Sequence, residues 1–84
     1  MKTYFITGGC GFIGSNFIHY LIKNQLAGQI INLDKLTYAG NSDNLSRIED
    51  NGSYHFIKGD ISNQEVVRSI LEEYKPNVIV NFAA

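Results

Sequence analysis

Short apolar runs alternate along this chain with longer stretches in which apolar residues recur at helical spacing. The apolar runs are rich in β-branched and aromatic residues and occupy residues 3–7, 29–34, 54–58 and 77–82. Runs of this length and composition are typical of strands that are buried on both faces of a sheet. We therefore predict four strands.

The intervening stretches predict helices. From about Phe12 to Gln25 an apolar stripe repeats every three or four residues, formed by Ile13, Phe17, Ile18, Leu21 and Ile22, and we expect it to face the sheet. Gly28 follows at a place where a glycine would end this helix.

A second helix is expected near the end of the chain, and a shorter one in the middle. Ser62 and Glu65 have the spacing of a capping box, and Pro76 should end the helix that follows. A short helix is predicted over residues 44–49. The resulting βαβαβαβ order predicts a parallel α/β sheet with right-handed crossovers and strand order 3-2-1-4.

Three glycines link the first strand to the first helix. Gly8, Gly11 and Gly14 have the spacing G-x-x-G-x-x-G, and Asp34 follows 20 residues after the last of them. Glycine permits a turn with positive φ and a close approach of backbone to a pyrophosphate, and the helix N-terminus attracts that anion. This arrangement is typical of a dinucleotide-binding Rossmann fold, although a glycine turn without a ligand is the alternative.

Acidic residues end the second and third strands. Asp34 is placed to accept hydrogen bonds from the adenosine ribose, which favours NAD over NADP, and the adjacent Lys35 could weaken that preference. Asp60 is expected near the adenine, or else caps the turn before Ser62. We interpret Cys10, within the turn, as a small residue tolerated in a tight space.

Composition narrows the class of protein. The 84 residues are 44% hydrophobic and 18% charged, which is typical of a globular chain. The net charge is −1 and there is no basic cluster, so we expect no nucleic-acid partner. No apolar run is long enough for a membrane span and no signal peptide is visible. With a single cysteine, these features lead us to expect a cytoplasmic protein.

Four short strings of the sequence resemble the extended short-chain dehydrogenase/reductase superfamily, and within it the dTDP-glucose 4,6-dehydratases. The strings are T-G-G-x-G-F-I-G at 7–14, D-K-L-T-Y-A-G-N at 34–41, G-D-I at 59–61 and N-F-A-A at 81–84. The second is the most specific of them, and the resemblance covers the whole chain.

The resemblance implies a set of contacts to NAD. Backbone amides of Phe12 and Ile13 would border the pyrophosphate, residues 34–37 would surround the ribose, and residues 60–61 would meet the adenine. The implied cofactor-binding residues are Gly8, Gly11, Phe12, Ile13, Gly14, Asp34, Lys35, Leu36, Thr37, Gly40, Asp60, Ile61, Phe82, Ala83 and Ala84.

The resemblance also implies an activity. The family uses NAD to convert dTDP-glucose to a 4-keto-6-deoxy sugar in rhamnose-type biosynthesis. We interpret residues 1–84 as the N-terminal part of an NAD-binding Rossmann domain, in a protein expected to be a homodimer. The family's catalytic Tyr-x-x-x-Lys pair is expected beyond Ala84, so we assign no catalytic or metal-binding residue and expect this part alone to be inactive. The alternatives are another nucleotide-sugar enzyme, such as a UDP-glucose 4-epimerase, and a non-catalytic NAD-binding regulator.

Overall fold

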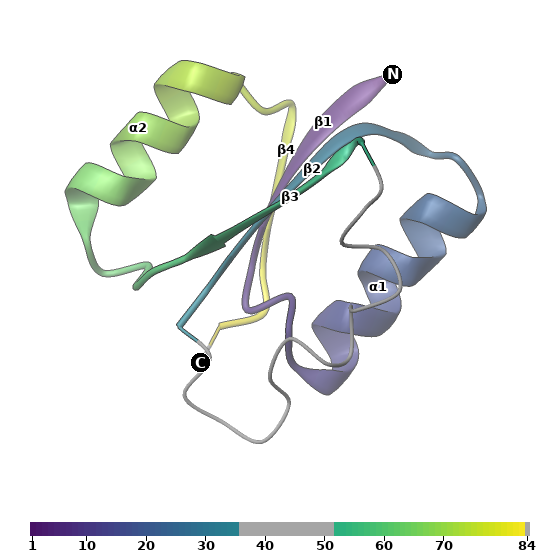
Figure 1. The fold of residues 1–84 in the computed structure, drawn as a ribbon, viewed down its shortest axis with the longest axis horizontal. Coiled ribbons are helices and arrows are strands. Elements are labelled where there is room, and N and C mark those ends of the chain that lie inside the picture. Colours follow the sequence, from purple (N-terminus) through teal and green to yellow (C-terminus); the bar gives the residue numbers. More distant parts are fainter. Residues whose placement is uncertain (36–51, 84) are drawn as a thin grey trace.

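A computed structural model describes residues 1–35 and 52–83, which form a parallel sheet with α1 against one face and α2 against the other (Figure 1). The elements are β1 (Lys2–Thr7), α1 (Phe12–Lys23), β2 (Ala27–Asp34), β3 (Tyr54–Lys58), α2 (Gln64–Tyr74) and β4 (Val78–Asn81). The predicted helix over residues 44–49 lies outside the described residues, as do the expected site residues Leu36, Thr37, Gly40 and Ala84.

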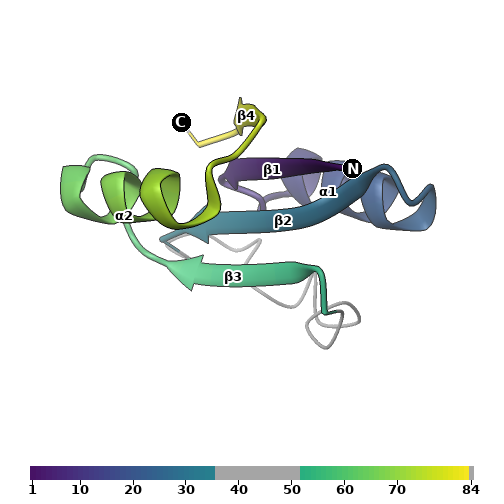
Figure 2. The same ribbon diagram turned by 90° about the horizontal axis from the view of Figure 1, so that it is seen from above.

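The strand order is β3-β2-β1-β4, as the sequence predicts. Figure 2 shows the four strands side by side in this order. Every neighbouring pair is parallel, and in register Ile6 lies opposite both Asn32 and Val80. Because the strands are parallel, their carboxyl ends meet along one edge of the sheet, which is where ligands bind in folds of this kind.

Each face of the sheet has its own apolar core, because successive strand side chains point to opposite faces. On the α1 face the buried residues are Ile6, Cys10, Ile18, Leu21, Ile30 and Tyr54. On the α2 face they are Phe5, Ile31, Leu33 and Ile70. The two clusters fix which face of each helix turns inward.

The buried stripe of α1 differs from the predicted one at its first turn. Ile13 is 67% exposed, whereas Gly14, Ser15, Ile18 and Leu21 are buried. A Cβ atom at Gly14 would lie 2.5 Å from the carbonyl oxygen of Gly8. The helix therefore packs directly on the backbone of the glycine turn at this point, and the inner position belongs to Gly14 instead of Ile13.

The predicted end of α1 at Gly28 is wrong. The helix ends at Lys23, and Gln25 adopts the left-handed conformation with φ 53°. The Gln25 N–H donates to the Ile22 carbonyl and the Leu26 N–H to the Leu21 carbonyl, which is the Schellman pattern. Gly28 lies in β2 instead, because the chain has already reversed at Gln25.

The predicted capping box of α2 is also displaced. Asn63 is the N-cap, and its side-chain oxygen accepts from the Glu65 and Val66 amides. The Ser62 N–H donates to an Asp60 side-chain oxygen, 2.9 Å away, so this serine belongs to the turn before the helix. The helix ends before Pro76, as predicted.

Replacing Gln25 with glycine should stabilise the fold. Glycine adopts positive φ without steric cost, so Gln25→Gly should raise the free energy of unfolding by about 0.5–1 kcal/mol. Lys23→Gly is the matched control within α1 and should lower it by a similar amount, about 0.5–1 kcal/mol. Urea denaturation of the full-length protein measures both, and equal destabilisation by the two changes would contradict the role given to Gln25.

Candidate functional site

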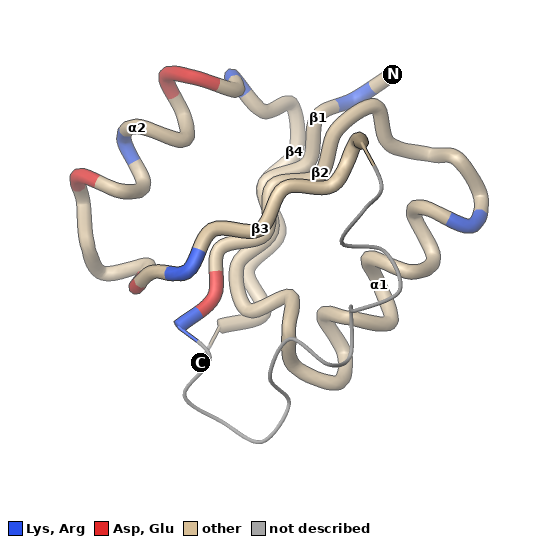
Figure 3. Tube along the Cα trace, viewed as in Figure 1, with Lys and Arg blue, Asp and Glu red and all other residues tan. Residues whose placement is uncertain are grey.

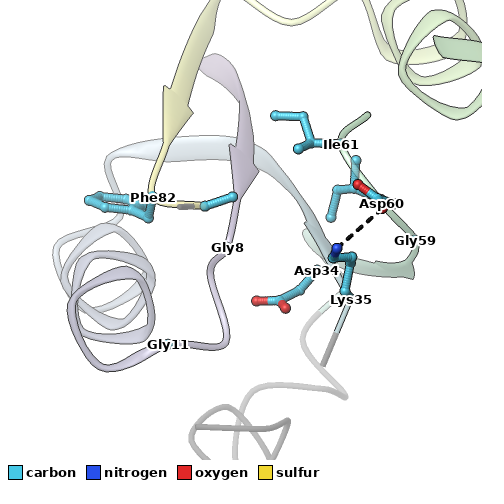
Figure 4. A pocket seen from close by; sticks show the side chains of 10 residues that line it. Gly8, Gly11, Asp34, Lys35, Gly59, Asp60, Ile61 and Phe82 are labelled. Atoms are coloured by element: carbon cyan, nitrogen blue, oxygen red, sulfur yellow. Dashed lines mark ion pairs between the residues drawn. The ribbon is translucent and has the colours of Figure 1, made fainter. Parts of the chain in front are cut away.

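A cleft of about 410 Å³ opens at the carboxyl edge of the sheet (Figure 4). It lies between the glycine turn after β1 and the ends of β2, β3 and β4. Its lining residues are Gly8, Gly11, Leu33, Asp34, Lys35, Gly59, Asp60, Ile61, Phe82 and Ala83. The structure therefore brings together expected site residues from four separate parts of the sequence.

Gly8 is a position in the turn where glycine is required. Its φ is +73°, and a Cβ atom there would lie 2.6 Å from the backbone nitrogen of Ala83. The Phe82 N–H donates to the Thr7 carbonyl at 2.8 Å, which holds the two segments together. Gly11, by contrast, has φ −73°, which any residue adopts. Gly11 is one of the residues that line the cleft.

Three successive amides of the turn are bonded to β2. The Gly8 N–H donates to the Leu33 carbonyl at 2.9 Å. The Gly9 N–H donates to Asn32 Oδ1 at 2.9 Å, and the Cys10 N–H donates to Asp34 Oδ2 at 2.8 Å. Asn32 and Asp34 are buried. Since alternate residues of a strand point to the same face, both side chains reach the turn from one side.

Asn32 was not anticipated as a site residue. It is fully buried, and its Nδ2 donates to the Tyr54 hydroxyl at 3.1 Å and to Cys10 Sγ at 3.5 Å. Cys10 is accordingly packed in the core, which agrees with its interpretation as a small buried residue. The sequence did contain a signal for this role, because Asn32 is an amide side chain inside an otherwise apolar strand. A buried polar group needs a hydrogen-bond partner, so such a residue indicates a contact with another part of the chain.

The N-terminus of α1 faces this cleft without a side-chain cap. Gly11 is the N-cap and the first turn carries no acidic residue. The Ser15 N–H donates to the Gly11 carbonyl, whereas the N–H groups of Phe12 and Ile13 have no acceptor among the described residues. Unpaired amides and the positive end of a helix dipole favour an anion at this place. The side chains of Phe12 and Ile13 are exposed, and neither residue is among those that line the cleft.

Asp34 lines the cleft at the end of β2 and is 4% exposed. From the sequence we expected the Asp34 carboxylate to accept hydrogen bonds from the ribose alone. In the structure it accepts the Cys10 N–H of the glycine turn. One side chain thus joins the end of β2 to the glycine-turn side of the cleft. This arrangement can orient a ribose and a pyrophosphate relative to each other.

Lys35 and Asp60 form an ion pair at the mouth of the cleft, with 3.2 Å between Nζ and Oδ2. The hydrogen bonds from Ser62, with a further contribution from Lys35, hold the pKa of the Asp60 carboxyl below its ordinary value. Figure 3 shows that charged residues gather at the carboxyl ends of β2 and β3 and along α2, whereas α1 is nearly uncharged. The charged side chains of Lys35 and Asp60 therefore lie at the cleft mouth, beside the carboxyl ends of β2 and β3.

One Tyr-x-x-x-Lys spacing does occur in the chain, from Tyr54 to Lys58, although we expected this pair only beyond residue 84. It lies along β3, where four residues span about 13 Å, compared with about 6 Å in a helix. The Tyr54 hydroxyl is bonded to Asn32 in the core. The two groups cannot act on one substrate atom, and neither is assigned a catalytic role.

Other kinds of site find no support in the described residues. Among them no group of three or more metal-binding side chains comes together. In the same part of the chain, no helix is sufficiently long and apolar to span a membrane.

Comparison with known proteins supplies the family context. Residues 5–84 match the family model described as GDP-mannose 4,6 dehydratase. The chain is 43% identical over 84 residues to a dTDP-glucose 4,6-dehydratase of Xanthomonas campestris pv. campestris (strain B100), covering 100% of this chain and 23% of that protein. The chain thus spans about a quarter of the length of such relatives.

Solved structures agree with the Rossmann-type doubly wound fold expected from sequence. The dTDP-glucose 4,6-dehydratase of Bacillus anthracis str. Ames, in complex with NAD, superposes with a TM-score of 0.94 at 46% identity, over 100% of this chain and 27% of that one. The UDP-glucose 4-epimerase of Thermotoga maritima has a TM-score of 0.82 at 30% identity, over 98% of this chain and 24% of that one.

Replacing Asn32 with leucine should destabilise the protein. The change leaves the buried Gly9 N–H without its acceptor, so Asn32→Leu should lower the free energy of unfolding by about 1–3 kcal/mol. Asn77→Leu is the matched control, because the Asn77 side chain accepts the Thr3 N–H at an exposed position where water can replace it. We expect Asn77→Leu to lower the free energy of unfolding by less than about 1 kcal/mol. Chemical denaturation measures both variants. Equal decreases in the free energy of unfolding would show that the buried bond to the Gly9 amide contributes little to stability.

Proposed function

Since this chain belongs to the GDP-mannose 4,6 dehydratase family, we propose that it is the N-terminal part of the NAD-binding domain of a dTDP-glucose 4,6-dehydratase, a lyase of nucleotide-sugar metabolism. The observation that carries the proposal is the cleft itself. It joins the glycine turn, an uncapped helix N-terminus and Asp34 at the carboxyl edge of a parallel sheet. Relatives with this name match the whole chain.

The residues of the cleft fit NAD. The pyrophosphate would lie against the Phe12 and Ile13 amides, where the absence of a side chain at Gly11 leaves room. The ribose would lie against Asp34, and the adenine against Asp60 and Ile61. When bound, the cofactor supplies a group that accepts a hydride from the sugar and later returns it. Phe82 and Ala83 would border its central part.

Cofactor choice follows from charge. Asp34 places a carboxylate beside the proposed adenosine site, and a carboxylate there accepts ribose hydroxyls but repels a 2′-phosphate. We therefore propose NAD, instead of NADP, as the cofactor. Leu36, Thr37, Gly40 and Ala84 remain part of the proposed contact set on the strength of the sequence.

The substrate and setting are proposed from the family. We propose dTDP-glucose as the substrate because dehydratases of that name match at 37–46% identity, whereas the epimerase of Thermotoga maritima matches at 30%. A cytoplasmic homodimer is the proposed form. The described residues supply cofactor contacts only, so we propose that residues 1–84 are inactive without the sugar-binding half.

The activity is tested on the full-length protein. Incubation with dTDP-glucose should give the 4-keto-6-deoxy product, which is detected by its absorbance in alkali. UDP-glucose offered in parallel should give no UDP-galactose. Epimerisation of UDP-glucose without dehydration of dTDP-glucose would replace the proposed reaction and leave the cofactor site intact.

Gly11→Val tests the phosphate site. Because φ at Gly11 is −73°, valine fits the backbone, but its side chain would occupy the cleft beside the helix N-terminus. We expect NAD affinity to fall by about tenfold or more, since backbone approach to the phosphates is lost. Gly52→Val is the control, because a Cβ atom at Gly52 meets no atom within 4 Å. Circular dichroism checks that both variants fold, and unchanged affinity in Gly11→Val would place the pyrophosphate elsewhere.

A further inference from the structure

We propose that Asp60 strengthens the preference for NAD over NADP set by Asp34, by holding the Lys35 ammonium away from the position of a 2′-phosphate. The inference rests on the proposed function, because it concerns how the same cofactor site discriminates. It assigns to Asp60 a specificity role that acts through Lys35 and is separate from its proposed contact with the adenine.

The sequence places a cation directly beside the residue that would read the ribose. Lys35 follows Asp34, and a basic residue at this end of β2 is what an NADP site uses to bind the 2′-phosphate. In the structure Lys35 Nζ lies 3.2 Å from Asp60 Oδ2. Figure 4 shows the ammonium turned across the cleft mouth towards Asp60, whereas the Asp34 carboxylate points towards the glycine turn.

The Asp60 carboxylate is fixed independently of Lys35. Its Oδ1 accepts the Ser62 N–H at 2.9 Å, and its backbone carbonyl accepts the Asn63 N–H at 2.9 Å. These bonds close the turn between β3 and α2. The bonds from Ser62 also lower the pKa of the carboxyl, so Asp60 is charged throughout the neutral range. A permanent, positioned anion therefore faces a flexible cation.

The ion pair contributes little to folding but is placed to act on a charged ligand. Its side chains are 51% and 41% exposed, and exposed pairs of this kind add little to stability. A 2′-phosphate arriving beside Asp34 would meet a cation already neutralised by Asp60. Neutralising Asp60 releases that cation, so NADP should gain affinity while NAD, which lacks the phosphate, gains none.

The experiment compares four forms of the full-length protein: unaltered, Asp60→Asn, Lys35→Gln and the double variant. Asparagine keeps a side-chain oxygen for the Ser62 N–H, so the turn is retained. Dissociation constants for NAD and NADP are measured by titration calorimetry at low ionic strength, because salt screens exposed charges. Any loss of an adenine contact affects both cofactors equally and cancels in their ratio.

We expect Asp60→Asn to shift the NADP-to-NAD affinity ratio towards NADP by about fivefold, the size of one exposed charge pair. In the Lys35→Gln background the same change should shift the ratio by less than about twofold. An unchanged ratio in Asp60→Asn, or equal shifts in both backgrounds, would overturn this inference alone. Failure of the unaltered protein to bind either dinucleotide would overturn the proposed function and this inference with it.

Discussion

The bonds between the glycine turn and β2 are the constraint on which the cleft depends. Three consecutive amides would otherwise be buried without partners, which is costly in an interior of low dielectric constant. A carbonyl of β2 and two of its side chains accept them. The turn consequently has one position relative to the sheet, and the start of α1 is aimed from it towards the cleft.

This constraint explains why the glycines differ in their roles. Gly8 supplies positive φ and allows the segment after β4 to approach, whereas Gly14 allows α1 to rest on the turn. Gly11 meets neither demand, because its φ is negative. It is nevertheless one of the residues that line the cleft. Structural and functional requirements are thus divided among positions that look equivalent in the sequence.

Charge is arranged on the opposite side of the cleft. Asp34 is buried and bonded to the turn, while Lys35 and Asp60 pair in partial contact with solvent. A buried, bonded carboxylate is fixed in place, whereas an exposed ion pair of this kind adds little to folding stability. The direction in which each of these charges points comes from the local turns.

Much of this protein could be predicted from the order of its residues alone. Parallel strands with order β3-β2-β1-β4 follow from alternating apolar runs and helical stretches, because crossovers are right-handed. The glycine spacing and the strand-end carboxylates locate the cleft by the same local logic. Two helix boundaries were less predictable. Gln25 reverses the chain after α1, where Gly28 was expected to do so, and Asn63 caps the start of α2, where Ser62 was expected.

Only the tertiary structure decided which groups meet across the sheet. Asn32 lies 23 residues from the amide that it accepts, and Lys35 is 25 residues from Asp60 in the sequence, so no local spacing links either pair. The pairing of β2 with its neighbours brings these groups within hydrogen-bond distance. Likewise, Tyr54 and Lys58 have the spacing of a catalytic pair but lie on a strand, which separates them. Sequence determined the elements and the place of the site, and packing between distant elements determined which donors and charges are available in it.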